Sequence, residues 1–155
     1  MSAFRKRLTA VLMLCVLLFA VAACAGRNRA AYAPAGLESA AARHRRFLAQ
    51  CGWLVSDSAP AVIAKELPGP DSPVFSVYNA LQKKQGFDLT PYAGRRVLCF
   101  TYEVLANAAG EPLTGVYAHV LESGNRMIGG DVSSVSSDGF MLGFNGERNE
   151  NDTFG

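Results

Sequence analysis

Residues 95–105 read Arg-Arg-Val-Leu-Cys-Phe-Thr-Tyr-Glu-Val-Leu, and this stretch decides the fold prediction. Successive residues of a β-strand point to opposite faces of its sheet. Leu98, Phe100, Tyr102 and Val104 would then share one face, and the residues between them would share the other. The pattern predicts a long β-strand.

Further strands are expected on both sides of it. Apolar runs bounded by turn residues occupy 115–122, 126–132 and 140–144, and shorter runs precede the long strand at 53–55 and 61–67. The connections after the long strand are short, which suits antiparallel neighbours.

Two helices complete the pattern. The first is expected at residues 37–50, followed by Gly52 as a stop. Its apolar stripe places His44 on the border. The second has Ser72 as N-cap, Pro73 at its first position and Gly86 beyond its end. The stripe of this second helix consists of Val74, Val77, Tyr78 and Leu81.

This order of elements predicts an α+β fold. We expect an antiparallel sheet of about five or six strands, packed by two helices in a two-layer arrangement. Both helices are placed on the inner face, so the stripe of the second helix should pack onto Leu98, Phe100 and Tyr102.

The N-terminus has the pattern of a bacterial lipoprotein signal. Three basic residues, Arg5 to Arg7, precede the uncharged stretch Leu8–Ala23, which ends Val21-Ala22-Ala23 before Cys24. The ending resembles a lipobox, in which the cysteine thiol receives the lipid and two acyl chains then hold the protein on the membrane. We therefore expect a signal peptide at 1–23, a lipid-anchored tether at 24–36, one domain at 37–144 and a polar disordered tail at 145–155.

Charge argues against a nucleic-acid partner. The 155 residues carry a formal charge of +2, but Arg5, Lys6 and Arg7 would leave with the signal peptide, which brings the remainder to −1. Nucleic-acid binding needs a basic footprint. We also expect no cofactor and no metal, because His44 and His119 have no partner at the spacing of a metal site.

Two stretches resemble an uncharacterised family of exported clostridial (Firmicute) proteins, known as a domain of unknown function. The first is Tyr78-Asn79-x-x-Gln82-x-x-Gln85-Gly86-Phe87-Asp88-Leu89-x-x-Tyr92-x-Gly94. The second is Ile128-Gly129-Gly130-Asp131 with Asp138-Gly139-Phe140-Met141. The resemblance covers about 46–144. It implies an envelope-facing domain, often carried on a lipoprotein or a single-pass anchor, and no catalytic residue.

Four polar residues are candidates for binding. Asn79, Gln82 and Gln85 lie three apart on the second helix and would form a polar groove for a peptide or glycan. The alternative, which we favour, is that their amides satisfy backbone groups. Asp131 follows two glycines that would let a ligand approach the backbone, although glycines in a strand more often mark a bulge.

Two cysteines remain beyond Cys24. Cys51 and Cys99 could form a disulfide in an oxidising compartment, or could act as small buried hydrophobic residues. Cys99 with His119 is the one nucleophile and base pair to consider, and its place within a strand argues against catalysis.

A basic cluster occupies the first helix, at Arg43, His44, Arg45 and Arg46. Anionic lipid headgroups would attract it, and a solvated helix end would explain it equally well.

The sequence thus predicts a membrane-anchored lipoprotein on the extracytoplasmic face of the cell membrane. Its domain is expected to bind an envelope protein, a peptide or a glycan without being an enzyme. The alternatives are a cell-envelope hydrolase with an unrecognised site and a structural component of a cell-surface or spore-envelope complex.

Overall fold

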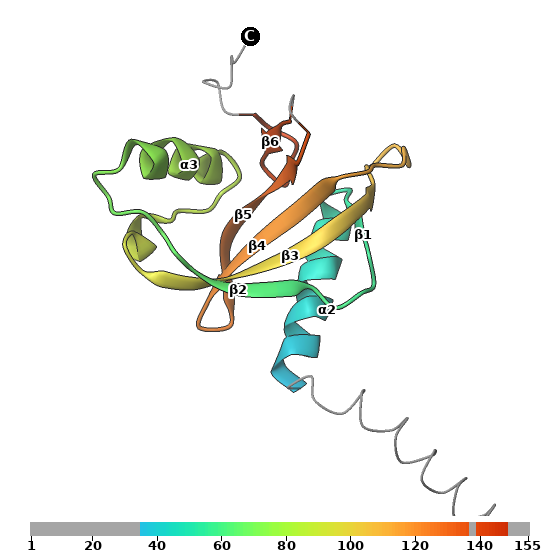
Figure 1. Cartoon of the computed structure of the whole chain (residues 1–155), viewed down its shortest axis with the longest axis horizontal. Helices are drawn as coiled ribbons and strands as arrows, with labels where there is room; N and C mark the ends of the chain where they lie inside the picture. The colour runs from blue at the N-terminus through green and yellow to red at the C-terminus, as the bar shows by residue number, and fades with distance from the viewer. Residues whose placement is uncertain (1–34, 137–138, 149–155) are drawn as a thin grey trace, which may run out of the picture. The chain divides into compact units, whose positions relative to one another are not determined.

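The computed structural model describes residues 35–136 and 139–148. The predicted signal peptide, Cys24 and most of the tether lie outside them, as do residues 149–155. Within the described part, no helix has both the length and the apolar composition that a membrane span requires. In chain order the elements are α2 (Ala35–Gln50), β1 (Leu54–Val55), β2 (Ala61–Glu66), α3 (Pro73–Lys84), the 3-10 helix η1 (Thr90–Tyr92), β3 (Arg96–Ala106), β4 (Val116–Ser123), β5 (Arg126–Ser134) and β6 (Met141–Leu142) (Figure 1).

All six strands belong to one antiparallel sheet, in the order β1-β3-β4-β5-β6 with β2 also paired to β3. Strands β1 and β2 share one edge of β3, where they pair with residues 104–106 and 96–101 respectively. Strand β4 pairs along the other edge. The predicted α+β fold, with helices packed on one antiparallel sheet, is confirmed.

The two helices contact opposite faces of β3. The ring of His44 on α2 packs against Phe100 and Tyr102, with ring centroids 4.8 and 5.9 Å away. Phe75 of α3 belongs instead to a buried apolar cluster with Val97, whose side chain alternates with those of Phe100 and Tyr102 along the strand. The prediction that both helices share one face, with α3 against Phe100 and Tyr102, is wrong.

Helix α3 buries only part of its predicted apolar stripe: Leu81 is fully buried, but the two valines of the stripe are exposed. Val74 is 68 % exposed and Val77 is 40 % exposed. Two polar residues take buried positions because their amides find backbone partners inside the fold. The buried residues of α3 are Phe75, Asn79, Leu81 and Gln82.

Both ends of α3 follow the prediction. The Ser72 side chain accepts a hydrogen bond from the Phe75 N–H (3.5 Å), and Pro73 is the first helical residue. Gly86 has φ of 85°, the left-handed conformation that stops the helix. These signals are local, so the sequence is sufficient to place them.

Candidate functional site

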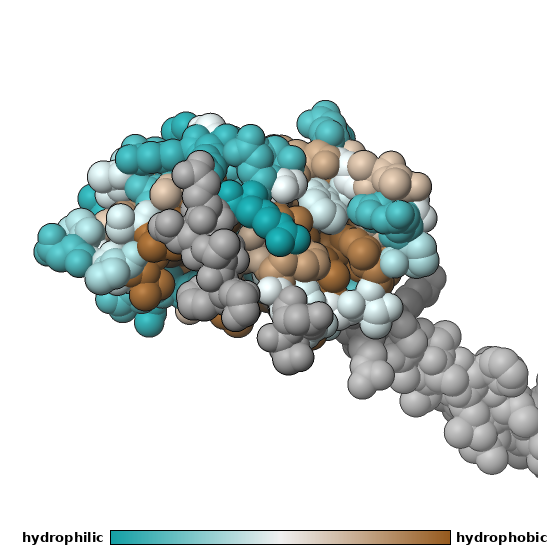
Figure 2. All heavy atoms as spheres, turned by 90° about the horizontal axis from the view of Figure 1, so that it is seen from above, coloured by the Kyte–Doolittle hydropathy of each residue, from teal (hydrophilic) through white to brown (hydrophobic). Residues whose placement is uncertain are grey.

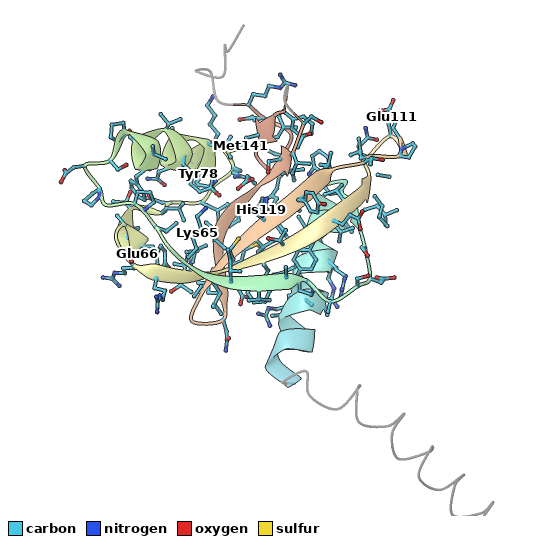
Figure 3. All side chains as sticks on the ribbon, viewed as in Figure 1. Lys65, Glu66, Tyr78, Glu111, His119 and Met141 are labelled. Atoms are coloured by element: carbon cyan, nitrogen blue, oxygen red, sulfur yellow. The ribbon has the colours of Figure 1, made fainter. Side chains whose placement is uncertain are left out.

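A groove of about 870 Å³ lies between α3 and the sheet face that α3 covers. Residues of α3 and of strands β2 to β6 line it. Figure 3 shows Lys65, Tyr78, His119 and Met141 around this space, whereas Glu111 lies at the distant turn between β3 and β4. The volume falls within the range of roughly 300–1,000 Å³ that is usual for ligand sites.

The walls of the groove are apolar and open to solvent. Ile63 on β2 is 59 % exposed, and Val74, Val77 and Met141 are exposed as well. Figure 2, which views the protein from above, shows apolar residues exposed between hydrophilic ones. Exposed apolar side chains that gather around a hollow are typical of binding surfaces.

Strand pairing builds a polar floor beneath these walls. Thr101 on β3 lies opposite His119 on β4, which lies opposite Asp131 on β5. Nδ1 of His119 is 3.0 Å from Oγ1 of Thr101. From α3, Tyr78 donates its hydroxyl to Oδ1 of Asp131 at 2.7 Å. Three strands and one helix therefore contribute side chains to one polar centre.

Asp131 is the least satisfied group of this floor. It is 4 % exposed, and its second oxygen, Oδ2, has no hydrogen-bond partner among the described residues. Burial raises the pKa of Asp131, while the Tyr78 hydroxyl and then the charges of His119 and Lys65 oppose the rise. The Ser133 hydroxyl is near enough to lower this pKa further, but it does not complete a hydrogen bond to Oδ2. The floor thus presents a carboxylate with one acceptor position unused.

Tyr78 stays protonated in this setting. Burial, followed by the neighbouring Asp131 carboxylate, raises the pKa of Tyr78 well above its ordinary value. The phenol is therefore the donor in its bond to Oδ1, which leaves Oδ2 as the open position.

Cys51 and Cys99, the two cysteines of the described residues, are free thiols. The disulfide that the sequence left open between Cys51 and Cys99 is not formed in the structure. Cys99 lines the groove, and burial raises its pKa. A thiol that keeps its proton is a poor nucleophile, and Nδ1 of His119 is bonded to Thr101 instead.

The amides of Gln82 and Gln85 join α3 to β5. Gln82 accepts from the Gly130 N–H (2.8 Å) and donates to the Gly130 carbonyl (2.9 Å). Gln85 donates to the same carbonyl (2.8 Å) and accepts from the Phe144 N–H (2.7 Å). A Cβ on Gly129 would lie 2.5 Å from Oε1 of Gln82, so glycine permits this close approach. This is the backbone-satisfying role that the sequence favoured for both amides.

Asn79 holds the turn that follows α3. Its side-chain oxygen accepts from the Leu89 N–H (2.7 Å), and its amide nitrogen donates to Asp88 and Thr90. Hydrogen bonds from the Thr90 hydroxyl and N–H, and then from Asn79, lower the pKa of Asp88 to about 2. Of the four binding candidates predicted from the sequence, Asp131 is the one that lines the groove.

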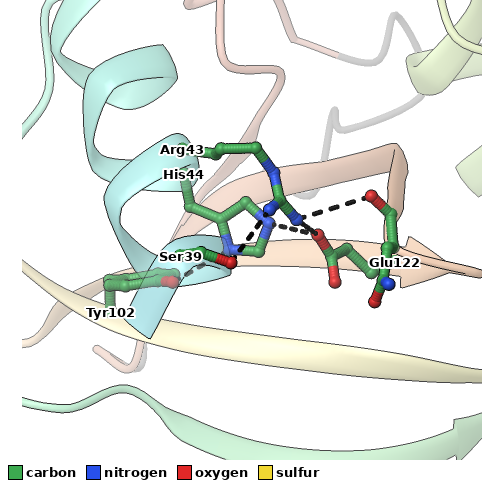
Figure 4. A network of polar contacts seen from close by, with 6 residues as sticks. Ser39, Arg43, His44, Tyr102 and Glu122 are labelled. Atoms are coloured by element: carbon green, nitrogen blue, oxygen red, sulfur yellow. Dashed lines mark hydrogen bonds and ion pairs between the residues drawn. The ribbon is translucent and has the colours of Figure 1, made fainter. Parts of the chain in front are cut away.

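The basic cluster of α2 contains a buried network. His44 is fully buried rather than on the border of its stripe. Oε1 of Glu122 accepts from Nη2 of Arg43 (2.7 Å) and lies 3.0 Å from Nε2 of His44, whose Nδ1 is 2.9 Å from the Tyr102 hydroxyl (Figure 4). Burial lowers the pKa of His44, and Glu122 opposes that shift. This part of the cluster fastens α2 to the sheet.

Arg45 of the same cluster is also engaged. Its guanidinium donates to the carbonyl oxygens of Ser56, Asp57 and Ser58 at 3.2, 2.9 and 2.6 Å. Arg46 is exposed. In the part of the chain that the structure covers, no three His, Cys, Asp or Glu side chains come together as metal ligands.

Comparison with known families matches residues 47–132 to a model described as "Domain of unknown function (DUF4830)". The chain belongs to this family. No curated protein matches the DUF4830 chain, and no solved structure matches it. The resemblance to a domain of unknown function is confirmed, whereas the clostridial origin remains a prediction.

The matched segment of the DUF4830 domain runs from the end of α2 to β5, so it contains most of the groove. Sequence reasoning missed two polar contributors to the groove, Lys65 and Thr101, and it considered His119 only as a partner of Cys99 or as a metal ligand. Their strands were predicted, but the signal that unites them is the cross-strand register. To predict that register, the alternating hydrophobic patterns of neighbouring strands would have to be aligned with one another.

Proposed function

We propose that this DUF4830 protein is a lipid-anchored, non-enzymatic binding domain on the extracytoplasmic face of the membrane. The observation that carries the proposal is the groove beside α3, with exposed apolar walls and a convergent polar floor. Such a combination is the usual form of a ligand site. The ending Val21-Ala22-Ala23-Cys24 supports the anchor.

The groove fits an envelope ligand better than a purely structural role. The apolar side chain of Val74 is solvent-exposed in the free protein, so it contributes little hydrophobic stabilisation to the fold. Its burial against a ligand would contribute about 25 cal/mol per Å² of apolar surface. The walls therefore favour a partner with an apolar part.

Binding of the neutral apolar dye Nile red to the full chain tests this role. We expect Val74→Glu to weaken dye binding at least several-fold because it places a charge in the wall of the groove. Leu54→Glu is the matched control, since Leu54 is 59 % exposed and does not line the groove. Any background from the apolar N-terminal segment is common to both variants. Equal dye binding by the two variants would overturn the proposed role of the groove.

A second candidate function is an envelope hydrolase, and the Thr101–His119 contact favours it. A hydroxyl bonded to an imidazole is the arrangement of an activated nucleophile. Ester hydrolysis that Thr101→Val abolishes, while dye binding persists, would establish that activity. Under the binding proposal, neither the unsubstituted protein nor Thr101→Val hydrolyses the ester.

A further inference from the structure

We propose that the groove takes an apolar peptide segment carrying one basic side chain, whose cationic group pairs with Asp131. This inference rests on the proposed binding function and names the class of its ligand.

The first argument is the unused oxygen of Asp131. Oδ1 accepts from Tyr78, whereas Oδ2 is buried without a partner among the described residues. A buried acceptor without a partner is unfavourable, roughly by 1–3 kcal/mol and more for a charged group. A donor from the ligand relieves this penalty, and an ammonium or guanidinium group also neutralises the carboxylate.

The second argument is charge. Three side chains that carry formal charge line the groove, namely Lys65, Glu66 and Asp131, so its formal charge is −1 when His119 is neutral. Lys65 is exposed on β2 and its charge is solvated, whereas Asp131 is buried. Pairing with the buried carboxylate is therefore stronger than repulsion by the exposed lysine.

The third argument is the shape of a basic side chain. Lysine and arginine have apolar stems that bury against apolar surface while the charged head reaches a polar group. The groove provides both environments: Val74 and Ile63 form apolar walls, and Asp131 is the polar group at the floor.

The fourth argument is length. The groove extends over strands β2 to β6, which follow one another across the sheet. At about 4.8 Å between neighbouring strands, this distance is roughly 19 Å. An extended chain of about six residues spans it at about 3.3 Å per residue. An oligopeptide therefore fills the groove better than a single small amine.

Titration of the full chain with two matched pentapeptides tests the inference. The probes are acetyl-Leu-Val-Lys-Val-Leu-amide and the same peptide with norleucine in place of lysine, and binding is measured by isothermal titration calorimetry. We expect the lysine peptide to bind at least tenfold more tightly. Asp131→Asn should remove that preference, because the asparagine amide points a donor where the cation would lie.

Lys65→Met provides a test that does not depend on a buried substitution. Lys65 is exposed, so the variant should fold, and loss of its repulsion should raise the affinity for the lysine peptide about threefold relative to the affinity for the norleucine peptide. Circular dichroism of Asp131→Asn checks that the variant is folded. If that variant does not fold, the response to Lys65→Met decides.

The outcomes separate this inference from the proposed function. Equal affinity for the two peptides, with Nile red binding still sensitive to Val74→Glu, would overturn the cationic ligand alone. Binding of n-octylamine as tight as that of the lysine peptide would overturn the assignment to a peptide. Loss of the difference between Val74→Glu and Leu54→Glu in dye binding would overturn the groove itself.

Discussion

Replacement of Gln82 by alanine should destabilise the domain strongly, although glutamine is a polar residue on a surface helix. The side chain is fully buried. Its amide bonds both the N–H and the carbonyl of Gly130, at 2.8 and 2.9 Å. The substitution therefore removes two bonds between α3 and β5 at once.

The magnitude follows from what each Gly130 group retains. The carbonyl still accepts from Gln85, whereas the N–H loses the side-chain oxygen that it binds. A buried donor without a partner costs about 1–3 kcal/mol. Loss of the buried methylene adds about 0.8 kcal/mol, and the cavity adds further. We expect a decrease of about 2–4 kcal/mol in the free energy of unfolding, against a typical total of about 5–15 kcal/mol.

Urea denaturation followed by circular dichroism measures this change. Gln82→Met retains the volume and loses the amide, so it should show only the hydrogen-bond part, about 1–3 kcal/mol. Lys83→Ala is the matched control on the next residue, which is exposed, and should stay within about 0.5 kcal/mol of the unsubstituted protein. A Gln82→Ala variant as stable as Lys83→Ala would refute the structural role of the amide.

Three further predictions concern the backbone, the α2 network and the anchor. Gly130→Ala should prevent folding or lower the melting temperature by many degrees, because its Cβ would overlap the His119 carbonyl oxygen. Gly69→Ala is the control, since a Cβ there meets open space, and its melting temperature should match that of the unsubstituted protein. The pKa of His44 is lowered in the folded protein, so the unfolded chain takes up the proton first as the pH falls. The stability that neutral His44 contributes is therefore present above pH 6.5 and is lost as the pH falls below that value. In thermal melts between pH 7 and 5, the melting temperature of His44→Gln should fall less than that of the unsubstituted protein. Mass spectrometry of the N-terminal peptide should find a lipid on Cys24, and an unmodified Cys24 or a different start would contradict the anchor.

Much of the fold could be predicted because its signals are local. The caps of α3 lie within a few residues of its ends, at Ser72, Pro73 and Gly86. The alternating residue pattern of 95–105 likewise predicts the strand β3, and both faces of that strand are partly buried. Chain order and short turns then suffice to predict an antiparallel sheet.

The face of α3 could not be predicted in this way. Apolar periodicity assigns Val74 and Val77 to the core, but they line an open groove. The same periodicity places Asn79 and Gln82 beside the apolar stripe; a backbone-satisfying role is favoured for their amides, but the sequence does not identify the backbone groups. Both side chains are buried because backbone groups of Leu89 and Gly130 lie within hydrogen-bonding distance. Only the tertiary structure brings these groups close to the two amides.

The candidate site depends even more on tertiary structure. Asp131 was a candidate from its own neighbours in sequence, the two glycines before it. Its partners Tyr78 and His119 come from elements about 50 and 12 residues away, and only helix packing and strand register bring them together.

The central claim, that the groove beside α3 binds a ligand, is tested most directly by methyl NMR spectroscopy of the full chain during titration with the lysine pentapeptide. We predict that the methyl signals of Ile63, Val74 and Met141, which line the groove, shift with a common binding curve. The methyl signals of Leu54 and Val135, exposed at 59 % and 73 % and outside the groove, should not move. Shifts at Leu54 and Val135 without shifts at the groove residues would contradict the account.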